Sequence, residues 1–216
     1  MSVGCIIRSY HLTDFLKPVI KNMAWVDKIV LGNYRFKSVR VSDDNTKDIC
    51  EDMKLENLVL KQGDYVDEHE GLNLCMEEFG DKFEYVFIID GDEILLRKDQ
   101  ETILNRLREE KKDAGLCTVI DFVKDLRHRA KIRTHKPLVI IKPNGRFYES
   151  RGANYGEGIV FNDINLYHLG YLVKDLDWKR CNYWDCPKKI DNIVYGEIEE
   201  YNPPKELLEI LGVNNE

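Results

Sequence analysis

No segment of the chain approaches the roughly 20 consecutive apolar residues that a helix needs to cross a membrane. The amino terminus starts directly with the strand-like segment VGCII, without the charged and long apolar regions of a signal peptide. These two absences predict a protein that has no membrane span and that is cytoplasmic.

Long basic runs and closely spaced cysteines are also missing. The 216 residues carry a formal net charge of -7, which disfavours binding to the phosphate backbone of nucleic acid. The six cysteines are scattered without a Cys-x-x-Cys pair, so we predict free thiols. Neither a nucleic-acid partner nor a disulfide framework is therefore expected.

The composition is that of an ordinary globular protein, with 43% hydrophobic and 33% charged residues, and the length predicts a single domain over residues 1–216. In the first half, short apolar segments typical of strands alternate with segments typical of helices, as in βαβ units. The predicted strands are 3–9, 27–33, 55–61, 85–90 and 115–123, and the predicted helices are about 12–23, 46–53, 70–79 and a helix capped by Asp99.

The sequence changes character after about residue 124, where basic and turn-rich segments follow. We expect this second half to build a substrate pocket. Within it, Asn144-Gly145 stands between VIIK and RFYES, a pattern typical of a β-hairpin. A final short helix is predicted after Pro203 and Pro204.

The most informative motif is the apolar run YVFIID, which ends at Asp90 and is followed by Gly91, Asp92 and Glu93. Continuous apolar character over this length indicates a strand that is buried on both faces, as in a parallel sheet. Such sheets bind ligands beyond the carboxyl ends of their strands. Two carboxylates suit Mg²⁺ or Mn²⁺, and Gly91 lets a ligand approach closely. The motif therefore predicts a site for a metal-bound diphosphate.

This motif has three other interpretations. An EF-hand loop needs an oxygen donor and a glycine where this chain has Ile94 and Leu95, which excludes it. A phosphatase of the haloacid dehalogenase type also ends a strand in Asp-x-Asp, but that motif opens its fold and has Thr or Val where Ile94 stands. A solvated turn with acidic caps is the third interpretation. The phosphatase and the turn stay open as alternatives.

Together these segments resemble family 2 glycosyltransferases with the GT-A fold, over roughly residues 3 to 185. The matching parts are the first strand with Arg8 at its end, SDDNTKDIC, Gly71-Leu72-Asn73 ahead of FIIDGDE, and LYHLGY at residues 166–171. The resemblance implies a Rossmann-like, mostly parallel central sheet flanked by helices, with a small antiparallel acceptor-side region. Residues 1–123 would then bind the nucleotide sugar, and residues 124–216 would form the acceptor-side half and the C-terminal helix.

The same resemblance implies a hexosyltransferase that moves a sugar from a UDP-linked donor to a hydroxyl group of a glycan, a lipid-linked molecule or a protein. Its cofactor would be Mn²⁺ or Mg²⁺. The implied metal ligands are Asp90, Asp92 and His168. The implied donor-binding residues are Arg8, Asp43, Asp44, Asn73, Asp90, Gly91 and Asp92. From the residues alone, the two aspartates at 43 and 44 and Asn73 also fit helix caps, and His168 also fits a structural histidine.

Inverting transfer requires a carboxylate that takes the proton of the acceptor hydroxyl. Three candidates follow from position: Asp121 at the end of a predicted central strand, and Glu149 and Glu157 in the segment expected to shape the acceptor site. The sequence does not choose among them. Two other functions stay open, a phosphohydrolase with Asp90 as its nucleophile and a nucleotide-sugar-binding protein without turnover.

Overall fold

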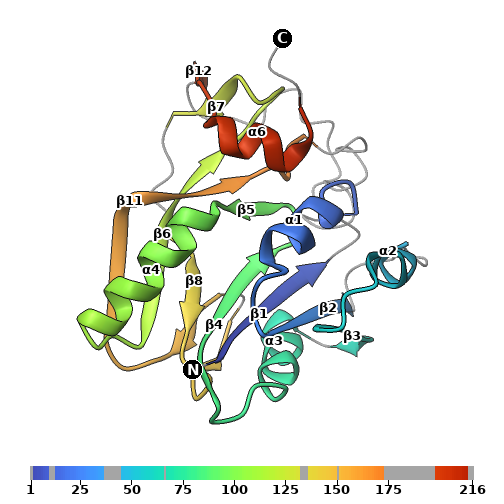
Figure 1. The fold of residues 1–216 in the computed structure, drawn as a ribbon, viewed down its shortest axis with the longest axis vertical. Coiled ribbons are helices and arrows are strands. Elements are labelled where there is room, and N and C mark those ends of the chain that lie inside the picture. Colours follow the sequence, from blue (N-terminus) through green and yellow to red (C-terminus); the bar gives the residue numbers. More distant parts are fainter. Residues whose placement is uncertain are drawn as a thin grey trace.

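The computed structural model describes residues 2–9, 13–36, 45–65, 67–131, 136–149, 151–172 and 198–213. A large sheet runs through the middle of the molecule, and helices pack on both of its faces (Figure 1). Small antiparallel sheets accompany it. The α/β fold class predicted from the sequence is therefore confirmed.

The large sheet has eight strands in the order β3-β2-β1-β4-β8-β6-β11-β5 (Figure 1). Its strands are β1 (Ser2–Ser9), β2 (Lys28–Phe36), β3 (Leu58–Tyr65), β4 (Phe83–Asp90), β5 (Glu93–Leu95), β6 (Ala114–Asp121), β8 (Leu138–Ile141) and β11 (Gly158–His168). Strand β1 is parallel to β2 and β4, β2 to β3, and β6 to β11. Strands β8 and β5 are antiparallel to their neighbours. The sheet is thus mostly parallel, as predicted.

Strand β1 illustrates why these apolar segments form the centre of the sheet. Cys5 and Ile7 belong to the hydrophobic cluster on one face, and Ile6 belongs to the cluster on the other. Successive side chains of a strand point to opposite faces, so an unbroken apolar segment is stable only when both faces are covered.

The helices divide between the two faces of the sheet. They are α1 (Leu16–Met23), α2 (Thr46–Met53), α3 (Glu68–Met76), α4 (Arg97–Glu109) and α6 (Lys205–Leu211). Apolar side chains of α1, α2, α4 and α6 join the cluster that contains Ile7, whereas those of α3 join the cluster that contains Ile6. Each helix therefore buries one apolar stripe against the sheet.

The direction in which the chain winds reverses at β1. Strands β2 and β3 follow on one side of β1, and β4 pairs with its other edge. In open α/β sheets, ligands bind in the crevice at such a reversal, beyond the carboxyl ends of the strands. Arg8 and Asp90 occupy these two ends and are direct register partners.

The predicted hairpin at Asn144-Gly145 is wrong. Strand β8 lies between β4 and β6, so both of its edges are already paired. Its four residues are all buried, which suits this central position. Strand β9 (Arg146–Phe147) pairs instead with β10 (Ala153–Asn154). Only the turn was correct, since the Gly145 N–H donates to the Lys142 carbonyl at 3.0 Å.

Two helix boundaries test the capping predictions. Helix α4 begins at Arg97, and its N-cap residue Leu96 makes no side-chain cap, so Asp99 lies inside the first turn instead of capping it. Helix α6 begins directly after Pro204, as expected.

The other small sheet pairs β7 (His128–Ala130) with β12 (Ile198–Glu200). Within the described ranges, every helix is too short or too polar to cross a membrane.

Candidate functional site

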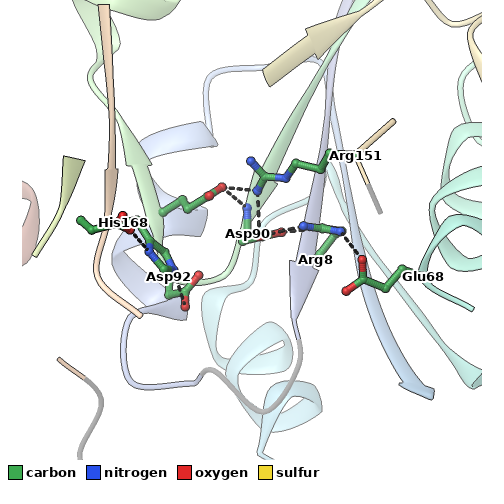
Figure 2. Close-up of polar contacts among 8 residues, drawn as sticks. Arg8, Glu68, Asp90, Asp92, Arg151 and His168 are labelled. Carbon is green, nitrogen blue, oxygen red and sulfur yellow. Dashed lines mark hydrogen bonds and ion pairs between the residues drawn. The ribbon is translucent and has the colours of Figure 1, made fainter. Parts of the chain in front are cut away.

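The carboxyl ends of β1 and β4 carry a pair between an arginine and a carboxylate. Arg8 donates from Nε to Oδ1 of Asp90 at 2.5 Å and from Nη2 to Oδ2 at 2.7 Å (Figure 2). A third nitrogen of Arg8, Nη1, lies 3.4 Å from Oε2 of Glu68 at the start of α3. This bidentate contact is a strong form of arginine–carboxylate pairing, and it fixes both side chains.

A second arginine reaches the same carboxylate from the loop that precedes β10. Nη2 of Arg151 lies 2.8 Å from Oδ2 of Asp90 and also contacts Glu93 (Figure 2). Glu93 in turn accepts a hydrogen bond from the backbone N–H of Asp90 at 2.9 Å. We call Arg8, Asp90, Glu93 and Arg151 the arginine cluster. It balances two guanidinium groups against two carboxylates.

Burial and charge act against each other on the carboxylates of this cluster. Burial alone raises the pKa of Asp90, but the charges of Arg151 and Arg8 outweigh it and hold that pKa below its usual range. For Glu93 burial prevails, and its pKa is raised. Asp90 is therefore the carboxylate that keeps its charge for the two arginines.

A second group of polar side chains lies beside the arginine cluster. Nδ1 of His168, at the end of β11, lies 2.6 Å from Oδ1 of Asp121, at the end of β6. Nε2 of the same ring lies 3.6 Å from Oδ2 of Asp92 (Figure 2). We call Asp92, Asp121 and His168 the histidine cluster. It contains two carboxylates and one imidazole.

The sheet register brings the histidine cluster together. His168 is the register partner of Asp121 in β6 and of Glu93 in β5. Backbone bonds lock this arrangement, because the Leu169 N–H donates to the Asp92 carbonyl at 2.8 Å. Burial lowers the pKa of His168, but the charge of Asp92 and the hydrogen bond to Asp121 prevail and raise it to about 9.

The donor chemistry of the histidine cluster suits a hard divalent cation. Among the described residues, no three His, Cys, Asp or Glu side chains are arranged as a complete metal site. Mg²⁺ and similar ions, however, commonly take one or two protein ligands and complete their shell with substrate phosphates and water. Asp92 and His168 fit such a partial site, and the His168 ring, whose pKa is about 9, must release a proton when it binds the metal. The oxygens of Asp90 instead face two guanidinium groups.

Asn73 and Glu157 lie away from these clusters. The side-chain amide of Asn73 bonds the backbone of Phe147 in both directions, at 2.9 and 3.0 Å, which attaches the β9–β10 hairpin to α3. Glu157 precedes β11 at the amino-terminal end of the sheet, where it pairs with Lys112 and its side chain is 75% exposed. The length of β6 separates it from Asp121, roughly 20 Å at the usual rise per strand residue.

The remaining predicted residues divide as follows. Glu149 is exposed and lies in the hairpin loop that also carries Arg151. Gly91 continues the β1–β4 ladder, since its N–H donates to the Arg8 carbonyl at 2.7 Å. Asp43 and Asp44 lie outside the described residues.

Arg151 and Glu68 were not predicted from the sequence as residues of the site. Arg151 stands in a glycine-rich stretch, and nothing in its neighbours distinguishes it from a solvated arginine. The available signal was charge balance: a buried acidic motif such as Asp90 to Glu93 requires cationic partners from elsewhere in the chain.

Comparison with known proteins identifies the fold of the chain. No family model and no curated protein matches the chain. Among solved structures, S. aureus TarS 1–349 in complex with UDP-GlcNAc superposes with a TM-score of 0.54 and 14% identity, covering 77% of this chain and 58% of that chain. The same protein in complex with UDP gives a TM-score of 0.54 and 12% identity, covering 88% of this chain and 67% of that chain. The chain has a GT-A-type fold.

In this GT-A-type fold, the two clusters lie at the carboxyl ends of β1 and β4 and at the neighbouring ends of β6 and β11. The likeness to TarS at this low identity shows the fold and leaves the residues of the site to be argued from their own geometry. The chain also spans only 58% of the length of the first matching TarS structure.

Proposed function

We propose that the chain is a metal-dependent glycosyltransferase that moves a sugar, of the hexose type, from a UDP-linked donor to a hydroxyl acceptor with inversion. The observation that carries the proposal is the pairing of His168 with Asp92 and Asp121 at the carboxyl ends of the sheet. The solved structures of TarS with UDP and UDP-GlcNAc support it, because they show a similar fold with a UDP-linked sugar and with UDP.

Under this proposal, the donor diphosphate lies over the crevice, and Asp92 and His168 hold Mn²⁺ or Mg²⁺. Bound there, the cation would offset the negative charge that develops on the nucleoside diphosphate as it leaves the sugar. Asp121 holds the His168 ring through Nδ1 and so presents Nε2 toward Asp92. A carboxylate behind a ligating histidine commonly fixes the ring in this way. Asp90 binds the two arginines.

The acceptor hydroxyl needs a base that can reach it from outside. Glu149 is exposed beside Arg151, whereas Asp121 is buried against His168 and Glu157 lies at the other end of the sheet. We therefore propose Glu149 as the group that takes the acceptor proton. A glycan, a lipid-linked molecule and a protein are all compatible acceptors.

The first test measures binding of nucleoside diphosphates and nucleotide sugars through the midpoint of thermal unfolding, with and without Mn²⁺. Stabilisation by UDP or UDP-GlcNAc that requires Mn²⁺, and that is lost in Asp92→Asn, is the expected result. Release of free sugar from the donor would then report turnover, which a binding protein without activity does not show. If no nucleotide stabilises the chain under either condition, the transferase proposal fails.

The phosphohydrolase alternative requires Asp90 to act as a nucleophile. It requires Asp90 to attack phosphorus, yet both carboxylate oxygens of Asp90 accept hydrogen bonds from Arg8 and Oδ2 also contacts Arg151. This arrangement stabilises the carboxylate and weakens it as a nucleophile. Trapping with a phosphate mimic at Asp90 would reveal the alternative directly.

A further inference from the structure

The side chain of Arg151 is deeply buried, yet one of its guanidinium nitrogens has no hydrogen-bond partner among the described residues. Its side chain is only 8% exposed, and its Nη2 contacts both Asp90 and Glu93. Its Nε is buried and has no hydrogen-bond partner in the part of the chain that the structure describes. Arg8 differs, because it places both Nε and Nη2 on one carboxylate. Buried donors are nearly always satisfied in native proteins, so the Nε of Arg151 calls for an explanation.

The other unpartnered arginine nitrogen has a local explanation. Nη1 of Arg97 is also buried without a hydrogen bond, but the guanidinium of Arg97 stacks on the ring of Trp25 at 3.5 Å from its centroid. Stacking on an aromatic face stabilises a guanidinium without further acceptors. Among the ring contacts of the described residues, none involves Arg151.

The position of Arg151 points to an anionic ligand. Arg8 and Arg151 converge on one oxygen of Asp90, at 2.7 and 2.8 Å, at the point where the sheet reverses its winding. Open α/β sheets bind ligands at such a reversal. The Asp90 side chain keeps 19% of its surface exposed, whereas the side chains of Arg8 and Arg151 are only 6% and 8% exposed. Guanidinium groups that are held rigidly are well suited to phosphate oxygens.

We propose that Arg151, supported by Arg8, is a ligand of the donor's diphosphate group, which rests on the function proposed above. In the chain without ligand, Asp90 and Glu93 balance the two guanidinium groups and hold them in place. A phosphate group would then take the place of one of these carboxylates at Nη2 and supply the acceptor that Nε lacks. The β9–β10 hairpin, attached to α3 through Asn73, keeps Arg151 at this position.

The test measures dissociation constants by calorimetry for UDP, inorganic pyrophosphate and uridine, all in the presence of Mn²⁺. Arg151→Lys keeps the charge but loses the fork, and we expect it to weaken UDP and pyrophosphate roughly tenfold or more. Uridine, which carries no phosphate, should bind equally well to the wild type and the variant. Arg151→Gln should weaken the two phosphate ligands at least as much.

Arg146→Gln is the matched control. Arg146 lies on the same hairpin but is exposed, and it donates to the backbone carbonyls of Pro143 and Gly145. It should leave all three dissociation constants unchanged. Thermal unfolding of each variant shows whether Arg151→Gln folds, and Arg151→Lys decides the question if it does not.

The outcomes separate this inference from the proposed function. Equal UDP and pyrophosphate affinities in the wild type and Arg151→Lys would overturn the inference and leave the transferase proposal standing. An equal loss for uridine would assign Arg151 a structural role only, which also overturns it. If the wild type binds pyrophosphate through Arg151 but no nucleotide, the anion site stands and the transferase proposal fails. If neither ligand binds, both fail.

Discussion

Asp121 and His168 end two neighbouring parallel strands, and Oδ1 of Asp121 lies 2.6 Å from Nδ1 of His168. This contact leaves Nε2 facing Asp92 at 3.6 Å. The ring is thus oriented by the strand register, because the two residues are direct register partners. A ring held from behind in this way can offer its other nitrogen to a ligand.

The first prediction concerns this orientation. Asp121→Asn should lower the affinity for Mn²⁺ by roughly 10–100-fold, because the His168 ring loses the carboxylate that fixes it. Mn²⁺ binding is measured by electron paramagnetic resonance, with and without UDP.

Asp125→Asn is the control for that prediction. Asp125 makes a contact of the same kind with Nδ1 of His128, at 2.7 Å, but on an exposed turn. This variant should bind Mn²⁺ as the wild type does. Unchanged Mn²⁺ affinity in Asp121→Asn would show that Asp121 does not position a metal ligand.

The second prediction concerns the structural role of Asp90, the first aspartate of the Asp-x-Asp motif. Asp90→Asn leaves the buried guanidinium groups of Arg8 and Arg151 with less compensating charge, so it should reduce the free energy of unfolding by about 3–5 kcal/mol. Urea denaturation of the protein without ligand measures this loss.

Asp163→Asn provides the comparison for Asp90→Asn. Asp163 contacts Nη1 of Arg106 through both oxygens, at 3.0 and 3.1 Å, but its side chain is 68% exposed. Exposed pairs contribute about 0–1 kcal/mol, so this variant should be almost as stable as the wild type. Similar losses in both variants would contradict the structural role of Asp90.

Much of the fold was predictable from the sequence because the central strands are continuous apolar runs. The segments around Ile6 and Ile88 are buried on both faces, and their pattern indicated this directly. The hairpin at Gly145 was mispredicted because strand pairing depends on which edges are free. That β8 lies between β4 and β6 is a property of the whole sheet.

The candidate site was predictable where its residues end strands. Asp90 and Asp121 could be located in this way, and Asp92 follows Asp90 in the same motif. His168 was implied by the resemblance of LYHLGY, and the structure brings it to the same end of the sheet. Arg151 could not be located, because its loop meets β4 only through tertiary folding and its neighbours in sequence carry no pattern. The pairing of Asp121 with His168 likewise depends on the register of two strands far apart in sequence.

The third prediction concerns the packing of α3 against β2. A Cβ atom at Gly71 would lie 2.3 Å from Cδ2 of the buried Tyr34 ring, too close for any real contact. Gly71→Ala should therefore destabilise the chain by roughly 1–3 kcal/mol despite the better helix propensity of alanine. At Gly80, a Cβ would meet nothing within 4 Å, so Gly80→Ala is the matched control. Urea denaturation compares the two variants, and equal midpoints would contradict the packing argument.

The last prediction is a dependence of stability on pH. Hydrogen bonds from Lys28 and Lys61 hold the pKa of Glu78, just after α3, at about 2. An unfolded glutamate has a pKa of about 4.3, so the unfolded chain takes up this proton first as the pH falls. The stabilising contribution of Glu78 is therefore fully present above about pH 4.3 and disappears as the pH falls toward 2.

Glu78→Gln isolates this contribution, because it removes the charge and keeps the size of the side chain. The free energies of unfolding of the wild type and the variant should differ at pH 7 and should converge as the pH is lowered through 4 and 3. Lys28 joins Glu78 to β2 and Lys61 joins it to β3, at 2.6 and 2.5 Å, so the loss should first loosen this edge of the sheet. A difference between the two proteins that stays constant from pH 7 to pH 3 would show that the two lysines do not stabilise the folded chain through the charge of Glu78.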